Sequence, residues 1–184
     1  YGRFSPGVRE YLAREIGNRS GRVTRDLTRR SDILVVGARA DSRIGGGALP
    51  SRIAETRQRR RPVFSEAAFR EALEGLPADR CNFPVATALS QSGATAEDAH
   101  LLAAFDLIAL KGDQCRFGDV ATLKTAASLR HDGCSAAQMI GILRVAQHTA
   151  PVGRHKVVVT SGGEPGLLWE DGLTTLTGQR FLPL

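Results

Sequence analysis

The sequence predicts a mixed α/β fold, in which a small parallel sheet flanked by helices precedes a mainly α region and a β-hairpin tail. Helix and strand patterns alternate through the first 76 residues with short links, as in folds that build a parallel sheet. Helical patterns then dominate as far as Pro151, and strand-like runs return after it. This change of pattern predicts two domains and a β-rich C-terminal segment, and 184 residues are enough for both domains.

The first domain, residues 1–76, contains five predicted elements. "GVREYLAREIG" places apolar residues on one helical face and ends at Gly17, and "SDILVVGA" is a β-branched run typical of a buried strand. "SRIAETRQRRR" predicts a helix that begins at a Ser51 cap and ends before Pro62. "PVFS" predicts a second strand, and "SEAAFREALEGL" predicts a helix capped by Ser65. The expected order is therefore α-β-α-β-α.

A linker, "PADRCNFP" at residues 77–84, is predicted to lead into the second domain, residues 85–150. We expect two short helices in "VATALSQSG" and "TAEDAHLLAAFDLI", then a hairpin in "LKGDQCRF" with Lys111-Gly112-Asp113 at its tip. Two further helices follow in "GDVATLKTAASLRHDG" and "SAAQMIGILRVAQ", the second capped by Ser135. Residues 151–184 are predicted to form strands in "HKVVVT", "GLLWE" and "LTTLTGQRF", with a hairpin turn at Asp171-Gly172.

The positive charge of the chain is confined to the first domain. Residues 1–76 hold 16 arginines, no lysine and 9 acidic residues, a net charge of +7, whereas residues 77–184 hold 9 basic and 10 acidic residues, a net charge of −1. A basic surface attracts polyanions in general, so the first domain is compatible with a nucleic-acid partner.

Several function classes have no support in the sequence. The three cysteines are widely spaced without a C-x-x-C pair, and the four histidines show no ligand spacing, so we expect reduced thiols and no metal site. The glycine-rich stretches "GGGALPS" and "SGGEPG" lack the P-loop lysine and the G-x-G-x-x-G spacing, and no G-x-S-x-G elbow occurs. We therefore expect a protein that is not an enzyme and needs no cofactor. No apolar run is long enough to cross a bilayer, which predicts a cytoplasmic protein without membrane contact, associated with the nucleoid if it binds DNA.

The first 76 residues resemble a BRCT domain. The resemblance is carried by Gly2 before Phe4-Ser5, by "VREYLAREI", by "SGRVTRDLTRRSDILVVG", and by "LPSRIAE" and "PVFSEAAFREAL". In phosphopeptide-binding members, a hydroxyl residue and a glycine after the first strand act with a basic residue that opens the second helix. The resemblance places Gly2 and Arg52 at two of these positions and Tyr1 at the hydroxyl position. It implies that Arg52 binds phosphate. The alternative is that Arg52 is an exposed first-turn residue.

Residues 83–147 resemble a MerR-type winged helix-turn-helix domain. "ALSQSGATAEDAHLLAAFDLI" is similar to the family's helix-turn-helix, and "CRFGDVATLKTAASLRHDGCSAAQMIGIL" is similar to the region that follows it. The resemblance implies that Thr95, Ala96 and His100 face a major groove and that Lys111 and Arg116 contact phosphates from the wing. Glu97 and Asp98 lie on the same helix and would repel phosphates. The alternative is therefore a module for protein docking or domain packing.

The run "RQRRRPVFSE" is the densest basic stretch, and its arginines are the nucleic-acid contacts that we expect: Arg57, Arg59, Arg60 and Arg61. Positive charge is also favourable at a helix C-terminus, so the same run is compatible with a solvated helix end. The sequence favours a protein that binds double-stranded DNA, with a regulatory or DNA-transaction role. The second hypothesis is an adaptor that binds a protein or phosphopeptide partner. A third is a fragment of a larger repeat-containing protein, because "TLTGQRFLPL" stops without a terminal helix.

Overall fold

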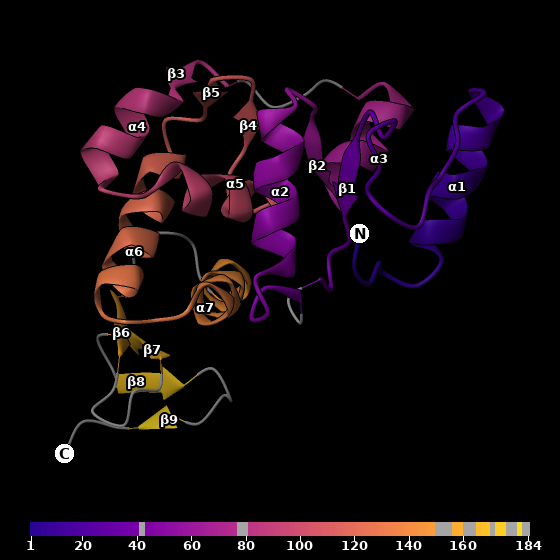
Figure 1. Cartoon of the computed structure of the whole chain (residues 1–184). Coiled ribbons are helices and arrows are strands. Elements are labelled where there is room, and N and C mark those ends of the chain that lie inside the picture. The colour runs from indigo at the N-terminus through magenta and orange to yellow at the C-terminus, as the bar shows by residue number, and fades with distance from the viewer. Residues whose placement is uncertain are drawn as a thin grey trace.

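The computed structural model describes residues 1–40, 43–76 and 81–149, together with four strands between residues 156 and 181 (Figure 1). In these residues the chain is mixed α/β, with seven helices, a two-stranded parallel sheet, a three-stranded antiparallel sheet and a four-stranded antiparallel sheet. The predicted mixed α/β class is confirmed. Among the helices described, none has the length and apolar character that a membrane span requires.

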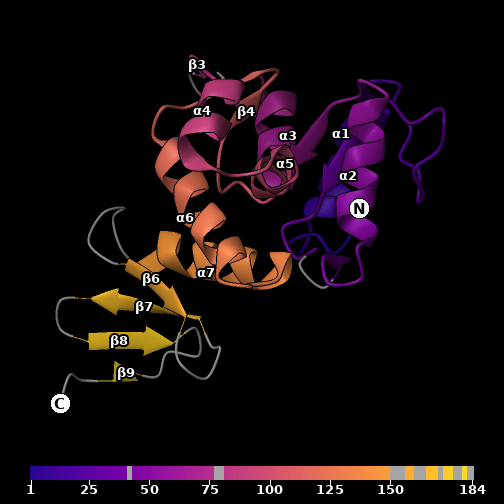
Figure 2. The ribbon, with the colours of Figure 1, turned by 60° about the vertical axis from the view of Figure 1, so that its left-hand side comes forward.

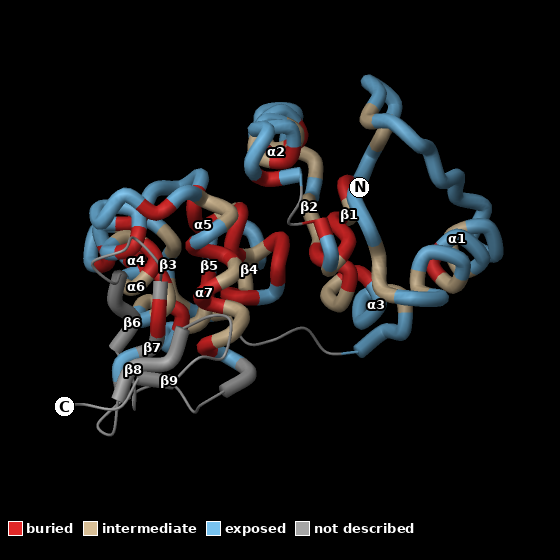
Figure 3. Tube along the Cα trace, turned by 90° about the horizontal axis from the view of Figure 1, so that it is seen from below, coloured by how far each residue is buried: buried red, intermediate tan, exposed pale blue. Residues whose placement is uncertain are grey.

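The first segment has the predicted order of elements: α1 (Val8–Asn18), β1 (Leu34–Val36), α2 (Ala48–Gln58), β2 (Val63–Ser65) and α3 (Glu66–Glu74). β1 and β2 are parallel, with Leu34 opposite Val63 and Val36 opposite Ser65. α2 packs on one face of the sheet and α3 on the other (Figures 1 and 3). α1 lies beside α3, because Tyr11 Oη donates to Glu74 and Arg19 donates to the carbonyl oxygen of Leu73.

The start of α2 corrects one prediction and the start of α3 confirms another. α2 begins at Ala48 rather than after a Ser51 cap, because Gly47 adopts a left-handed φ of 69° and lets the chain enter the helix earlier. Pro50 then falls in the first turn, where its missing N–H costs no helical hydrogen bond. Ser65 caps α3 as expected, since its Oγ accepts a hydrogen bond of 3.0 Å from the Ala68 N–H.

Residues 1–3 run beside β1 and extend the parallel arrangement. The Gly37 N–H donates to the carbonyl oxygen of Tyr1 and the Arg39 N–H donates to that of Arg3, both at 2.9 Å. Gly37 is required at this close approach, because a Cβ atom there would lie 2.3 Å from the carbonyl oxygen of Arg3. The loop that follows this extended segment therefore lies next to the loop that follows β1.

The second segment contains β3 (Phe83–Pro84), α4 (Val85–Ser92), α5 (Ala96–Ala104), β4 (Leu110–Lys111), β5 (Gln114–Cys115), α6 (Asp119–His131) and α7 (Ala136–Thr149). β3 pairs with β5 in a sheet of order β3-β5-β4, so regular structure begins inside the predicted linker, of which residues 77–80 lie outside the described part. α4 and α5 form the expected helix-turn-helix, with Gly93 at a φ of 72° in the turn. Ser135 accepts from the Gln138 N–H at 3.3 Å, as its predicted capping role requires.

The C-terminal strands β6 (Lys156–Val159), β7 (Pro165–Trp169), β8 (Gly172–Thr175) and β9 (Arg180–Phe181) form an antiparallel sheet in sequence order. β6 and β7 agree with the first two predicted strand regions, whereas the third, "LTTLTGQRF", holds two antiparallel strands, β8 and β9, rather than one. Gly172 belongs to β8, where it pairs with Trp169, and the other residue of the predicted turn, Asp171, lies outside the described residues.

The two segments share one hydrophobic core. Buried side chains of α2 and β1 belong to the same cluster as those of α5, α6 and α7, and Figure 3 shows buried stretches in both segments. α5 packs against α2 and β2, and α7 lies beside the N-terminal end of α2 in both Figure 1 and Figure 2. A side-chain hydrogen bond from Ser65 Oγ to Asp106 joins the same two segments. We call this contact region, formed by α2, β2, α5 and Asp106, the junction.

Because the two segments share a core, we expect a destabilising substitution in α2 to destabilise the second segment as well. Ile53 of α2 is 3% exposed, and we expect Ile53→Ala to lower the free energy of unfolding by about 2–5 kcal/mol, because it leaves a cavity. Hydrogen exchange followed by mass spectrometry should show faster exchange in both segments. Val23→Ala, at a side chain that is 47% exposed, is the control and should change stability by less than about 0.5 kcal/mol. Faster exchange confined to the first segment would contradict a shared core.

Candidate anion-binding cleft

A cleft of about 710 Å³ opens at the carboxyl ends of the extended segment and β1. Loop residues 2–7 and the first turn of α1 form most of its wall, and Arg39 follows β1 on the adjacent side. One wall residue comes from the second segment, Arg144 of α7. In open parallel sheets this edge is where ligands bind, since the loops there diverge and leave a crevice.

The cleft is strongly basic. Four arginines line it, Arg3, Arg9, Arg39 and Arg144, and Glu10 is the only carboxylate among the lining residues that the structure describes. Arg3, Arg9 and Arg39 are exposed and form no salt bridge with any described residue. Guanidinium groups offer a planar fork of N–H donors that matches phosphate and carboxylate oxygens. The cleft can therefore bind an anionic group with several charge-assisted hydrogen bonds.

Glu66 holds the loops of the cleft in place. Its side chain is buried, and its carboxylate accepts from the Ser5 N–H at 3.1 and 3.2 Å and from the Ala38 N–H at 2.9 Å. The first donor lies in loop 2–7 and the second lies in the loop after β1. Because Glu66 is also the first residue of α3, the helix N-terminus stabilises its negative charge. One carboxylate thus fixes the distance between the two loops that carry Arg3 and Arg39.

Arg144 is positioned by residues that follow α5. Its guanidinium carbon lies 5.7 Å from the centroid of the Phe105 ring, which is buried. The neighbouring Asp106 accepts from Ser65 Oγ across the junction. Burial raises the pKa of Asp106, and the nearby charges of Glu71 and Glu66 add to this, while the Ser65 hydrogen bond and the positive charge of Arg144 act in the opposite direction. Arg144 is therefore close enough to Asp106 to compensate part of its charge.

The two residues predicted to bind phosphate, Gly2 and Arg52, have different surroundings. Gly2 lines the cleft with a φ of +82°, and a Cβ atom there would lie 2.5 Å from Ala40 Cβ. Arg52 is half-buried on α2, where its guanidinium carbon lies 4.5 Å from the Tyr1 ring centroid. Arg52 does not line the cleft. It packs on an aromatic ring at the position where the resemblance expects a hydroxyl residue.

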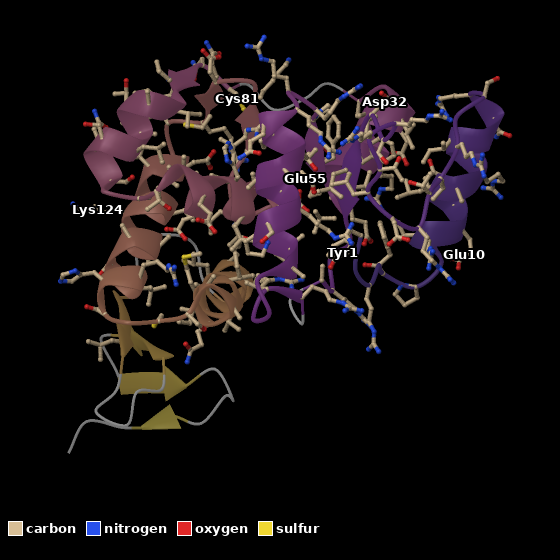
Figure 4. All side chains as sticks on the ribbon, in the orientation of Figure 1. Tyr1, Glu10, Asp32, Glu55, Cys81 and Lys124 are labelled. Carbon is tan, nitrogen blue, oxygen red and sulfur yellow. The ribbon has the colours of Figure 1, made fainter. Side chains whose placement is uncertain are left out.

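The arginine run lies at the other end of α2. Arg59 forms an ion pair with Glu55 at 2.5 Å and donates to the carbonyl oxygen of Thr28 at 3.3 Å, and Arg61 forms an ion pair with Asp32. Figure 4 shows Asp32 on the opposite side of the first segment from Tyr1 and Glu10, which lie near the cleft. Arg57 is half-buried, and Arg60 is exposed in a left-handed conformation with a φ of 54°. Two of the four arginines predicted to contact DNA therefore already have acidic partners.

The residues expected to face a DNA groove lie on the helix that packs against the first segment. Thr95 caps α5, because its Oγ1 accepts from the Asp98 N–H at 3.0 Å. His100 is half-buried and close to Arg57 of α2, and burial together with that positive charge lowers its pKa to about 4. DNA contact by His100 stays a prediction.

The two predicted wing residues have different environments. Lys111 is exposed on β4. Arg116 donates from its Nε to Asp119 at 3.2 Å and forms an ion pair with the same carboxylate at 3.0 Å. Asp119 is buried and also accepts from the backbone N–H of Ala109 and of Arg116. Arg116 thus supports the hairpin through Asp119, and Lys111 is the more exposed of the two wing residues.

Of the described residues that line the candidate cleft, the sequence predicts Gly2 as a site residue and none of the four arginines. The charge of +7 in residues 1–76 includes Arg3, Arg9 and Arg39 but does not single them out from the other arginines there. The sequence did not single out Arg144, because residues 77–184 carry no excess positive charge. The sequence places Glu66 as an acidic residue in the first turn of α3. It does not predict the hydrogen bonds that Glu66 accepts from the backbone, because these depend on how the loops fold.

The lowered pKa of His100 predicts a pH dependence of stability. The unfolded chain takes up this proton near pH 6.5 and the folded chain only near pH 4, so stability should fall as the pH decreases between these values. At about 1.4 kcal/mol per pKa unit the decrease reaches at most about 3 kcal/mol. Urea denaturation at pH 7 and pH 4.5 should show that His100→Gln reduces this dependence. The exposed His131→Gln variant is the control and should retain it; equal curves for the two variants would contradict the placement of His100.

No protein-family model, curated protein or solved structure matches this chain.

Proposed function

We propose that this chain is a DNA-binding protein with a regulatory or DNA-transaction role, and that the basic cleft of the first segment is its main phosphate contact. The observation that carries the proposal is the convergence of Arg3, Arg9, Arg39 and Arg144 on one cleft, where Glu10 is the one acidic residue among the described lining residues. Phosphate neutralisation by arginine and lysine supplies most of the non-specific affinity of proteins for double-stranded DNA. The excess charge of the first segment adds a long-range attraction to the same polyanion.

The arrangement of both segments supports this proposal. The parallel strands β1 and β2 between α2 and α3 agree with a BRCT-like first domain. The helix-turn-helix of α4 and α5, followed by the β4–β5 hairpin, agrees with a winged-helix second domain. Because α5 packs against α2 and β2, we propose that the second domain orients the DNA and reads few bases. Exposed Lys111 at the hairpin adds a phosphate contact.

The second candidate is an adaptor that binds a phosphorylated protein segment, and the concave shape of the site favours it. A cleft of about 710 Å³ encloses one anionic group and its neighbours rather than a long stretch of duplex. Gly2, which the BRCT resemblance assigns to phosphopeptide binding, lines this cleft. The same arginines would then contact a single phosphate on a peptide.

Salt dependence of duplex binding tests the first proposal. We expect a variant that carries Arg3→Gln, Arg9→Gln and Arg39→Gln to bind a 20-base-pair duplex more weakly, with a log–log salt slope flattened by about 0.9 for each phosphate that the variant no longer neutralises. Fluorescence anisotropy over a range of NaCl concentrations measures both quantities. A variant with Arg59→Gln, Arg60→Gln and Arg61→Gln removes the same charge, but it should flatten the slope less, because Arg59 and Arg61 already have acidic partners.

Two outcomes would decide against this account. Equal flattening by both triple variants would show that net charge, rather than the cleft, determines binding. A wild-type chain that ignores the duplex but binds a phosphoserine peptide in preference to its unphosphorylated form would establish the adaptor instead.

A further inference from the structure

The cleft is lined by residues of both segments. Arg144 is its only lining residue from the second segment among the described residues, while the others come from positions 2–10 and from Arg39. The phosphate site of the proposed function is therefore complete only when α7 lies against the first segment. The contacts that hold α7 in this position decide whether Arg144 reaches the ligand.

A ring contact and a neighbouring carboxylate position Arg144 on the second-segment side of the junction. The buried ring of Phe105, which follows α5, lies 5.7 Å from its guanidinium carbon. Asp106 is the next residue and adopts a left-handed φ of 59°, which turns the chain at this point. A guanidinium group has five N–H donors in a planar fork, so it can contact an aromatic ring, a neighbouring carboxylate and a ligand at the same time.

Two consecutive residues of the first segment fix the other side. Ser65 Oγ donates to Asp106, and Glu66 accepts from the backbone of both cleft loops. The start of α3 thus connects the wall that carries Arg3 and Arg39 to the residue beside Arg144. The two walls of the cleft are connected through Glu66, Ser65 and Asp106.

We propose that Arg144 is a phosphate-contacting residue supplied by the second segment, that Phe105 and Asp106 are its positioning residues, and that anion binding and docking of the two segments are therefore coupled. This inference rests on the proposed function. An anion that contacts Arg3, Arg39 and Arg144 together binds the docked arrangement more tightly than the separated one. By thermodynamic linkage, bound anion stabilises the docked arrangement by the same factor.

The contact itself is tested at Arg144. With the 20-base-pair duplex as probe, Arg144→Gln should flatten the salt slope by about 0.9, as expected for one phosphate contact. Arg144→Lys keeps the charge and should restore most of the slope. Lys124→Gln removes one charge from the same segment on its far side (Figure 4) and should leave the slope unchanged. If Arg144→Gln and Lys124→Gln behave alike, Arg144 makes no phosphate contact.

The coupling is tested at Asp106. Asp106→Gly removes the acceptor of Ser65 but tolerates the positive φ, and Asp106→Asn keeps both an acceptor oxygen and a residue that tolerates this conformation. We expect Asp106→Gly to weaken duplex binding several-fold and Asp106→Asn to have a smaller effect. The rate of trypsin cleavage in the 77–84 region gives a readout that is independent of affinity. Saturating duplex should slow this cleavage in the wild type, and it should slow it less in the Asp106→Gly variant. A thermal unfolding curve confirms that each variant is folded.

The outcomes separate the two proposals. A wild-type chain that binds no duplex overturns both the proposed function and this inference. This inference alone is overturned if the wild type binds duplex and the Arg144→Gln and Asp106→Gly variants have the same salt slope and the same protection from trypsin as the wild type.

Discussion

The buried carboxylate of Glu66 is the interaction on which the basic cleft depends. It accepts hydrogen bonds from the backbone of two loops that are distant in sequence, at Ser5 and Ala38. An unpaired backbone N–H or an unpaired buried charge is costly, so the carboxylate and its donors stabilise each other only in this arrangement. Ser65 directly precedes it and binds Asp106 of the second segment. The start of α3 therefore organises both the cleft and the junction.

The arginines of the first segment fall into two groups with different physical roles. At the C-terminal end of α2, Arg59 and Arg61 are paired with acids, and such exposed pairs contribute little to stability and reduce the charge available to a ligand. At the opposite end, Arg3, Arg9 and Arg39 surround a cleft in which Glu10 is the one carboxylate among the described lining residues. The density of arginines along the sequence therefore does not indicate which of them converge on one surface of the folded chain.

Local patterns predicted most of the elements, because caps, glycine stops and apolar periodicity act over a few residues. The order of the first five elements, the Ser65 cap and the helix-turn-helix follow from such patterns. Gly47, rather than Ser51, begins α2, since a left-handed glycine competes with a side-chain cap and periodicity does not distinguish them. Long-range contacts determine that α5 packs on α2 and that Arg144 lines the cleft. Short sequence patterns do not predict such contacts. The packing of α5 on α2 agrees with the alternative, stated from the sequence, in which the second domain is a packing module.

Duplex binding by Glu66→Ala tests the central role of Glu66 most directly. This change makes the chain more positive, so net charge alone predicts tighter binding to DNA. If Glu66 organises the cleft, the variant should instead bind the 20-base-pair duplex more weakly than the wild type and with a flatter salt slope. Glu71→Ala, which removes an exposed acid of the same helix, is the matched control and should bind at least as tightly as the wild type. Glu66→Ala binding as tightly as Glu71→Ala, with both variants folded, would contradict the account.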